Sequence, residues 1–384
     1  MRLATFNASL FRTKAGQLRA ELAAGDAQAH LVAETLQRIA PDILLLSEID
    51  QDAEAVAIFR DRYLAAPHGD APALALPYAI QPACNTGVDS ELDLDQDGKP
   101  GGPGDAWGFG KYPGQYCFAI LSRWPIRGDQ VRSFANLRWA QMPGHVMPAG
   151  DPPEIAAARR LSSKSHLDVP IDVEGTLLHV LAHHPTPPVF DGPEDRNGRR
   201  NHDEIRLWAD YLHEPDAQWI LDDAGVRGGL ARNAWFVVMG DHNADPVDGD
   251  SFPHAIAQLL DHPRIDARVI PASDGAIASA RTQAGANDAQ QGDPAHDTAD
   301  FDDRGSGNLR VDYVLPARGL EIVGAGVYWP VAGDAGARLL GASDHRAVWL
   351  DLELTLELTL ELTPVLAPAA PAATANQPSG AAAP

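Results

Sequence analysis

The tripeptide Ser343-Asp344-His345, near the C-terminal end of the chain, has chemical partners at the ends of apolar runs far upstream. The run Leu3-Ala-Thr-Phe6 is followed by Asn7, and the run Ile43-Leu-Leu-Leu46 leads to Glu48. Short Leu-rich and β-branched runs bounded by turn residues are typical of buried strands, and the loops that leave strands often carry chemistry. We therefore predict one site assembled from both ends of the chain.

The middle of the chain repeats this pattern twice. Trp235-Phe-Val-Val-Met239 precedes Asp241 and Asn243, and Asp312 lies within Leu309-Arg-Val-Asp-Tyr-Val-Leu315. The carboxylates, amides and imidazole of the combined set suit a hard divalent cation and a general base, and the set contains no covalent nucleophile. The chain also lacks the GxSxG, GxxxxGK[ST] and HExxH motifs, which argues against serine hydrolases, P-loop NTPases and zincins.

In this order, the motifs resemble those of the endonuclease/exonuclease/phosphatase superfamily. The matching stretches are Thr5-Phe-Asn7, Leu46-Ser-Glu48, Ala182-His-His-Pro185, Gly240-Asp-His-Asn-Ala-Asp245, Arg310-Val-Asp-Tyr313 and Ser343-Asp-His345. The resemblance implies an α/β four-layer sandwich, in which two mixed, mainly antiparallel β-sheets pack face to face with helices outside. The alternation of predicted strands and helices points to the same class. One such helix is predicted over residues 27–39, before Pro41.

The resemblance also assigns roles to the strand-end residues. Asn7, Glu48 and Asp344 would be the metal ligands, with Mg²⁺ or Mn²⁺ as the expected cofactor. Asp241 suits the general base that activates water, and Asn243 would orient this base or the phosphate. Some nucleases of the family carry an acidic ligand two residues after the first Asn. This chain has Ser9 there, so the number of metals stays open.

Two histidines complete the implied site. His345 suits a contact to a phosphoryl oxygen, and Asp312 would hold its imidazole in position, as carboxylates do in other hydrolases. His183 corresponds to a family position that contacts phosphate or the leaving oxygen. Its neighbour His184 is expected to point the other way from the strand, and either to be structural or to support a residue of the site without contacting the substrate. For each polar residue taken alone, a capping or turn-forming role is the alternative.

A basic segment follows the histidine pair. It carries Arg196, Arg199 and Arg200, and arginine recognises phosphate in a bidentate manner. We therefore consider the three as substrate-binding candidates, with a solvated loop as the alternative. Asn201, followed by Glu204, resembles a capping box and predicts that a helix starts there.

A second candidate site is the stretch Asp93-Leu-Asp-Gln-Asp-Gly98, which has the spacing of a calcium loop. Asp93, Asp95 and Asp97 could converge on Ca²⁺, but Gly104 stands where such loops have a bidentate Glu. An acidic, turn-rich surface loop is the alternative.

The composition limits the partners. A formal net charge of −23 on 384 residues does not favour nucleic acid, because DNA binding relies on Lys and Arg to release counterions. A small phosphorylated substrate fits this charge.

No apolar run approaches the ~18 residues of a membrane span. With a strand predicted from Leu3, we expect no signal peptide and a cytoplasmic monomer, whereas a processed or truncated N-terminus would leave a secreted or periplasmic protein open. Cys84 and Cys117 are expected to be free thiols, with a disulfide between them as the alternative.

The site requires residues 1–354 to form one catalytic domain, with a Pro-, Gly- and Asp-rich insertion over about 64–114. Residues 355–384 read as a low-complexity, disordered tail. The function we predict is a metal-dependent phosphoesterase that hydrolyses phosphodiesters, as nucleases do. Two alternatives stay open: a phosphatase for a small molecule or lipid head group, and a catalytically silent, calcium-binding scaffold.

Overall fold

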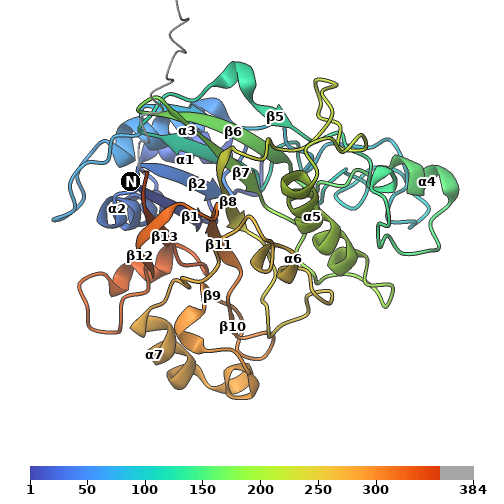
Figure 1. The fold of residues 1–384 in the computed structure, drawn as a ribbon. Helices are drawn as coiled ribbons and strands as arrows, with labels where there is room; N and C mark the ends of the chain where they lie inside the picture. Colours follow the sequence, from blue (N-terminus) through green and yellow to red (C-terminus); the bar gives the residue numbers. More distant parts are fainter. Residues whose placement is uncertain (355–384) are drawn as a thin grey trace, which may run out of the picture. The chain divides into compact units, whose positions relative to one another are not determined.

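Two β-sheets organise the fold, and the first is built around the two apolar runs at the start of the chain (Figure 1). The computed structural model describes residues 1–354, so the predicted tail lies outside the described residues. The strands of the first sheet are β1 (Arg2–Asn7), β2 (Ile43–Ser47), β3 (Tyr78–Ile80), β4 (Phe118–Ser122), β12 (Glu321–Val327) and β13 (Val348–Glu353). Their order is β12-β13-β1-β2-β4-β3, and only β1 and β2 run parallel.

The second sheet carries the middle motifs. Its strands are β5 (Arg132–Ser133), β6 (His166–Val173), β7 (Thr176–His183), β8 (Trp235–Asp241) and β11 (Asp312–Pro316). Their order is β11-β8-β7-β6-β5, with β7 and β8 parallel and the other pairs antiparallel. A separate two-stranded ribbon joins β9 (Ala299–Asp300) to β10 (Asn308–Leu309). The predicted pair of mixed, mainly antiparallel sheets is confirmed.

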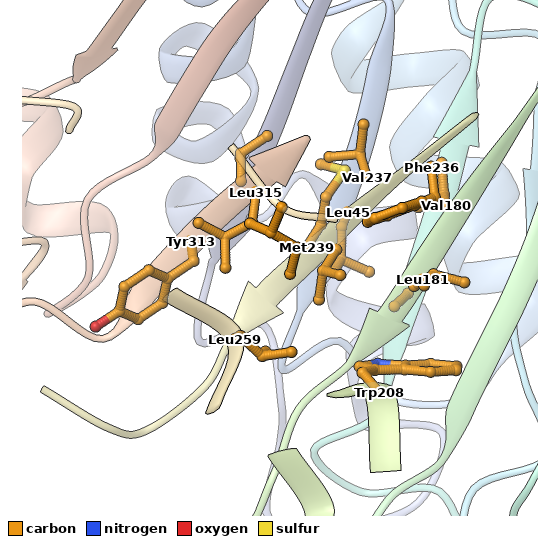
Figure 2. Close-up of a cluster of buried hydrophobic side chains, with 14 of the residues drawn as sticks. Leu45, Val180, Leu181, Trp208, Phe236, Val237, Met239, Leu259, Tyr313 and Leu315 are labelled. Atoms are coloured by element: carbon orange, nitrogen blue, oxygen red, sulfur yellow. The ribbon is translucent and has the colours of Figure 1, made fainter. Parts of the chain in front are cut away.

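Alternation along the strands explains why the sheets stack. Leu3, Ile43 and Leu45 point towards the second sheet, where Leu45 packs with Val237 and Met239 (Figure 2). Their neighbours in sequence point to the opposite face, since successive side chains of a strand alternate. Each fully buried Leu, Ile or Val contributes about 1.5–3 kcal/mol to folding. This dry layer therefore fixes the positions of the strand ends.

Helices cover the outer faces of both sheets. On the first sheet, a second buried cluster joins its outward side chains to α1 (Gln17–Ala24), α2 (Ala27–Ile39) and α3 (Ala53–Ile58). On the second, α5 (Arg196–His213) places Trp208 beside Leu181 of β7 (Figure 2). The remaining helices are α4 (Pro153–Ala158), α6 (Ala257–Leu260), α7 (Asp274–Gln283), the π-helix η1 (Phe59–Leu64), and the 3₁₀ helices η2 (Gly128–Gln130), η3 (Trp139–Gln141), η4 (Gly285–Ala289), η5 (Pro294–His296) and η6 (Ala337–Ala342).

The structure refines two local predictions. The helix predicted over residues 27–39 is α2, whose cap Asp26 accepts a hydrogen bond from the Ala29 amide (2.7 Å). The predicted insertion is mostly irregular, yet its strand β3 pairs with β4 and extends the first sheet. Part of the insertion is therefore built into the fold.

Two further observations bear on the class of protein. Cys84 and Cys117 are both buried, and neither forms a disulfide within residues 1–354. Within residues 1–354, no helix has the length and apolar character that a membrane crossing requires.

Candidate active site

Asp241, the last residue of β8, is the centre of a polar cluster where the two sheets meet. It is 1% exposed. Asn7 Nδ2 donates to its Oδ2 (3.0 Å), and the backbone amide of Asn243 donates to its Oδ1 (2.9 Å). His184 Nε2 and His345 Nε2 lie 3.3 and 3.7 Å from Oδ2. Residues from the beginning, middle and end of the chain thus surround one buried carboxylate.

Asp312, at the start of the neighbouring strand β11, forms a buried pair with His345, which lies between η6 and β13. Asp312 lies opposite Asp241 in the register of β11 and β8, and its Oδ2 contacts His345 Nδ1 (2.9 Å) and accepts from Thr298 Oγ1 (2.9 Å). Burial disfavours the imidazolium, but Asp312 and Asp241 outweigh it and raise the pKa of His345 to about 10. Burial raises the pKa of Asp312 to about 6. The pair is therefore ionic between these two values, and His345 can present an N–H to an anion at neutral pH.

Glu48 follows β2 directly and is half-buried. Burial raises its pKa to about 7; His345 and Lys164 oppose this rise, whereas Asp241 and Asp344 add to it. Within residues 1–354, no donor hydrogen-bonds to the Glu48 carboxylate. Desolvation and neighbouring carboxylates both disfavour its charged form, and a divalent cation would relieve both. The donor set therefore fits a hard metal ion on this side of the cluster.

The other two predicted ligands differ in their surroundings. Asp344 is exposed, and its Oδ1 accepts from the hydroxyls of Ser9 and Ser343, each at 3.3 Å. Asn7 is buried, and its Oδ1 already accepts from the Ser9 amide (3.2 Å) while its Nδ2 faces Asp241. Asp344 is thus free to contribute oxygen ligands. Asn7 hydrogen-bonds to Asp241, and its role as a metal ligand stays a prediction.

The backbone is strained around the cluster. Ser9, Glu48, Tyr116 and Asn243 have left-handed φ values of 49°, 57°, 58° and 50°. Non-glycine residues adopt this conformation at a cost of about 1–3 kcal/mol each and do so preferentially at functional sites. Gly240 is required for a different reason: a Cβ there would lie 2.1 Å from the carbonyl oxygen of His183. The close approach of β7 and β8 places Asp241 against the histidine segment.

The structure places His184, and not His183, beside Asp241. His183 lies in a buried cluster with His166, whose Nε2 is 3.1 Å from its Nδ1, and with the ring of His242 at 4.3 Å. The Trp208 ring of α5 packs nearby at 6.1 Å. The predicted alternation of the two histidines is correct, but the assignment of faces was reversed. The signal that could have shown this is the apolar face of α5, which includes Trp208 and packs against the same face of β7 that carries His183.

This placement predicts unequal effects of two neighbouring substitutions. His184→Ala removes a contact to Asp241 and should lower kcat by about 10- to 100-fold, because Asp241, the predicted general base, loses a positioning partner. His183→Ala should lower the melting temperature through a cavity while changing kcat less. Thermal unfolding and steady-state kinetics on both variants test this. A larger loss of kcat in folded His183→Ala would restore the original assignment.

The buried histidines also predict acid sensitivity. Burial lowers the pKa of His166 to about 4 and of His242 to about 3, from the ordinary 6.5. Below pH 6.5 these two histidines are protonated in the unfolded chain but stay neutral in the folded protein. The contribution of the two neutral histidines to the free energy of unfolding is therefore complete above pH 6.5. As the pH falls from 6.5 towards the pKa of the folded state, each histidine lowers the free energy of unfolding by about 1.4 kcal/mol per pH unit.

His242→Asn tests this, since asparagine keeps a donor for Gly240 O but does not titrate in this range. The difference in unfolding free energy between wild type and variant, measured with urea, should fall as pH is lowered from 6.5 to 4. A constant difference would contradict the prediction.

The three candidate arginines are engaged elsewhere. The helix α5 starts at Arg196 and not after Asn201, so all three lie on its first turns. Arg196 Nη1 donates to both oxygens of Asp151 (2.8 and 2.7 Å), and Arg200 Nη2 donates to the Trp107 carbonyl (2.8 Å). Arg199 Nη1 reaches the Val146 carbonyl (3.3 Å). Within the described residues, none of them hydrogen-bonds to the Asp241 cluster, and the predicted capping role of Asn201 is wrong.

The three aspartates of the possible calcium loop do come together. Carboxylate oxygens of Asp93, Asp95 and Asp97 lie within 4.8 Å of one another. The Gly98 amide donates to Asp93 Oδ2 (3.0 Å), as the predicted tight turn requires. Asp95 and Asp97 are exposed, and calcium binding stays a prediction.

The described chain is thus an α/β sandwich with a buried acid, amides and an ionic Asp-His pair at its strand ends. A family model described as Endonuclease/Exonuclease/phosphatase family matches residues 4–345, and the chain belongs to this family. The members of this family are hydrolases that act on phosphoester bonds, and this chain is one of them. No match was found among curated proteins.

Solved structures with a similar fold are distant in sequence. An endonuclease/exonuclease/phosphatase from Beutenbergia cavernae DSM 12333 is 18% identical with a TM-score of 0.49, covering 92% of this chain and 71% of that chain. A family protein from Leptotrichia buccalis C-1013-b is 14% identical (TM-score 0.48), covering 92% of this chain and 100% of that chain. Beta toxin 275-280 from Staphylococcus aureus is 13% identical (TM-score 0.45), with coverages of 92% and 100%.

Proposed function

We propose that this protein is a divalent-metal-dependent phosphoesterase that cleaves phosphodiester bonds with a water molecule activated by Asp241. The observation that carries the proposal is the buried Asp241 carboxylate, which is oriented by Asn7 and lies against His184 and His345. A buried, oriented carboxylate suits proton abstraction from a water that attacks phosphorus. The net charge of −23 supports a small phosphorylated substrate over duplex DNA.

Each residue has a defined task in this mechanism. Asp241 would take the proton as the water oxygen bonds to phosphorus and the ester bond breaks. Asn7 and the Asn243 amide hold both oxygens of that carboxylate in place. His345, kept protonated by Asp312, would donate an N–H to a phosphoryl oxygen as negative charge develops.

Glu48 and Asp344 would hold Mg²⁺ or Mn²⁺, with Asn7 Oδ1 as a further oxygen nearby. When bound, such a cation neutralises charge on the phosphoryl oxygens and orients the substrate. The raised pKa of Glu48 and its lack of a hydrogen-bond donor in residues 1–354 support this assignment.

Hydrolysis of two chromogenic esters tests the proposal. Bis-p-nitrophenyl phosphate and p-nitrophenyl phosphate would be compared with Mg²⁺, Mn²⁺, Ca²⁺ or no metal, with Asp241→Asn as the control for contaminating activity. We expect metal-dependent turnover of the diester. Preferred monoester turnover would favour the phosphatase alternative, and no turnover with any metal would favour a calcium-binding scaffold.

A further inference from the structure

Lys164 is a buried lysine that no role described above uses. It lies just before β6 and is 6% exposed. Its Nζ donates to the Pro185 carbonyl (3.4 Å), and the same oxygen accepts from Asn243 Nδ2 (3.2 Å). Because the Asn243 backbone amide binds Asp241, the shared carbonyl places the ammonium at the edge of the candidate active site.

The charge of this ammonium is not neutralised within residues 1–354. An ammonium has three donors, but Lys164 uses one, in a long contact to a neutral carbonyl, and its Nζ forms no ion pair in the described chain. Burial lowers the pKa of His184 well below its usual value, and Lys164 lowers it further. The same charge opposes the rise in the pKa of Glu48. Burying an unpaired charge is costly, so this position calls for an anion.

The lysine is also held in place from both sides. Glu204 of α5 accepts from the Ser163 amide (2.6 Å) with one oxygen and from the Thr186 amide (2.7 Å) with the other. It therefore ties together the two segments that carry Lys164 and its carbonyl partner. On the far side, the Asn85 amide donates to the Lys164 carbonyl (2.9 Å). Such bracing limits the motion of a side chain before its ligand arrives.

We propose that Lys164 binds a non-bridging phosphoryl oxygen of the substrate. It is a second cationic contact supplied by the chain, in addition to protonated His345 and to the metal ion expected at Glu48. The inference rests on the proposed phosphoesterase function, because it names a substrate contact within that site. The ligand class is a phosphodiester or, after hydrolysis, the phosphomonoester product, and inorganic phosphate shares the same phosphoryl oxygens.

Three variants in the full-length protein test the inference. Lys164→Met removes the charge at similar size, Lys164→Arg retains it, and Lys111→Met is the control at an exposed lysine. Two quantities would be measured with Mg²⁺: the Kd of inorganic phosphate by calorimetry, and kcat/KM for the better of the two nitrophenyl esters. Thermal unfolding without phosphate reports stability.

We expect Lys164→Met to weaken phosphate binding and to lower kcat/KM by about tenfold or more, the effect of losing a hydrogen bond to a charged group. Lys164→Arg should recover part of both, and Lys111→Met should change neither. The melting temperature of Lys164→Met should stay the same or rise, because an unpaired buried charge has been removed.

Other outcomes separate the two proposals. Phosphate affinity and kcat/KM within about twofold of wild type in Lys164→Met would overturn the inference, as would a parallel loss of melting temperature and function in both Lys164 variants. If the wild type binds phosphate through Lys164 but hydrolyses neither ester, the proposed function fails and Lys164 is not a substrate contact, although a phosphate-binding site at Lys164 remains. If the wild type hydrolyses an ester without measurable phosphate binding, the change in kcat/KM alone decides.

Discussion

Asp241→Asn is expected to lower kcat by about 10²- to 10³-fold, the usual scale for losing a general base together with its charge. The substitution keeps the size of the side chain, but an amide cannot take a proton from water. In the wild type, Asn7 Nδ2 donates to Asp241 Oδ2. In the variant, Asn7 Nδ2 would face either the amide oxygen or the NH₂ group of the new asparagine. Steady-state assays with saturating metal would measure the decrease in kcat.

Asp250→Asn, at an exposed position downstream of the same strand, is the matched control and should keep the wild-type rate. Both variants should retain the far-ultraviolet circular dichroism of the wild type. A rate for folded Asp241→Asn within about threefold of wild type would remove Asp241 from the proton transfer and leave the mechanism without its base.

Glu48→Gln should abolish most metal-dependent activity. We expect EDTA to stop wild-type turnover and Mg²⁺ or Mn²⁺ to restore it. In the variant, turnover should be lower by about 10²-fold or more at the same metal concentration, because the metal supplies several kcal/mol of transition-state stabilisation. Metal binding to the folded state also raises the melting temperature by mass action.

That thermal shift separates metal binding from chemistry. Without metal, Glu48→Gln should be at least as stable as the wild type, since burial already disfavours the charged carboxylate. With Mg²⁺, only the wild type should gain stability. Equal shifts in both proteins would show that the cation is held elsewhere, and full activity in metal-stripped buffer would contradict the metal-dependent mechanism.

Local sequence patterns predicted the strands and several site positions because both depend on short segments. The run before Glu48 and the run before Asp241 alternate between two packed faces, so their ends were visible as polar residues after apolar ones. The helix α2 was predicted with its observed bounds, since its apolar positions and the proline that follows it are local in the sequence.

The errors arose where distant segments decide the outcome. Whether His183 or His184 faces Asp241 depends on which face of β7 the helix α5 covers, and the sequence does not state this directly. Glu204 has the spacing of a capping residue, yet it accepts hydrogen bonds from Ser163 and Thr186. Lys164 could not be predicted as a site residue, because its hydrogen-bond partner is a backbone carbonyl, that of Pro185, in the segment that follows β7.

The pairing of β1 with β13 has a consequence for the newly made chain. Leu3 pairs with Leu350, and the Met1 amine donates to the Leu352 carbonyl (2.8 Å), so β1 cannot pair with β13 until the whole intervening chain has been translated. At about 5–20 residues per second, that interval is roughly 20–70 s. During this time one edge of β1 has no strand beside it, and an unpaired apolar edge invites association with other chains. Growth conditions that slow the ribosome would therefore lengthen the exposure and increase the demand for chaperones.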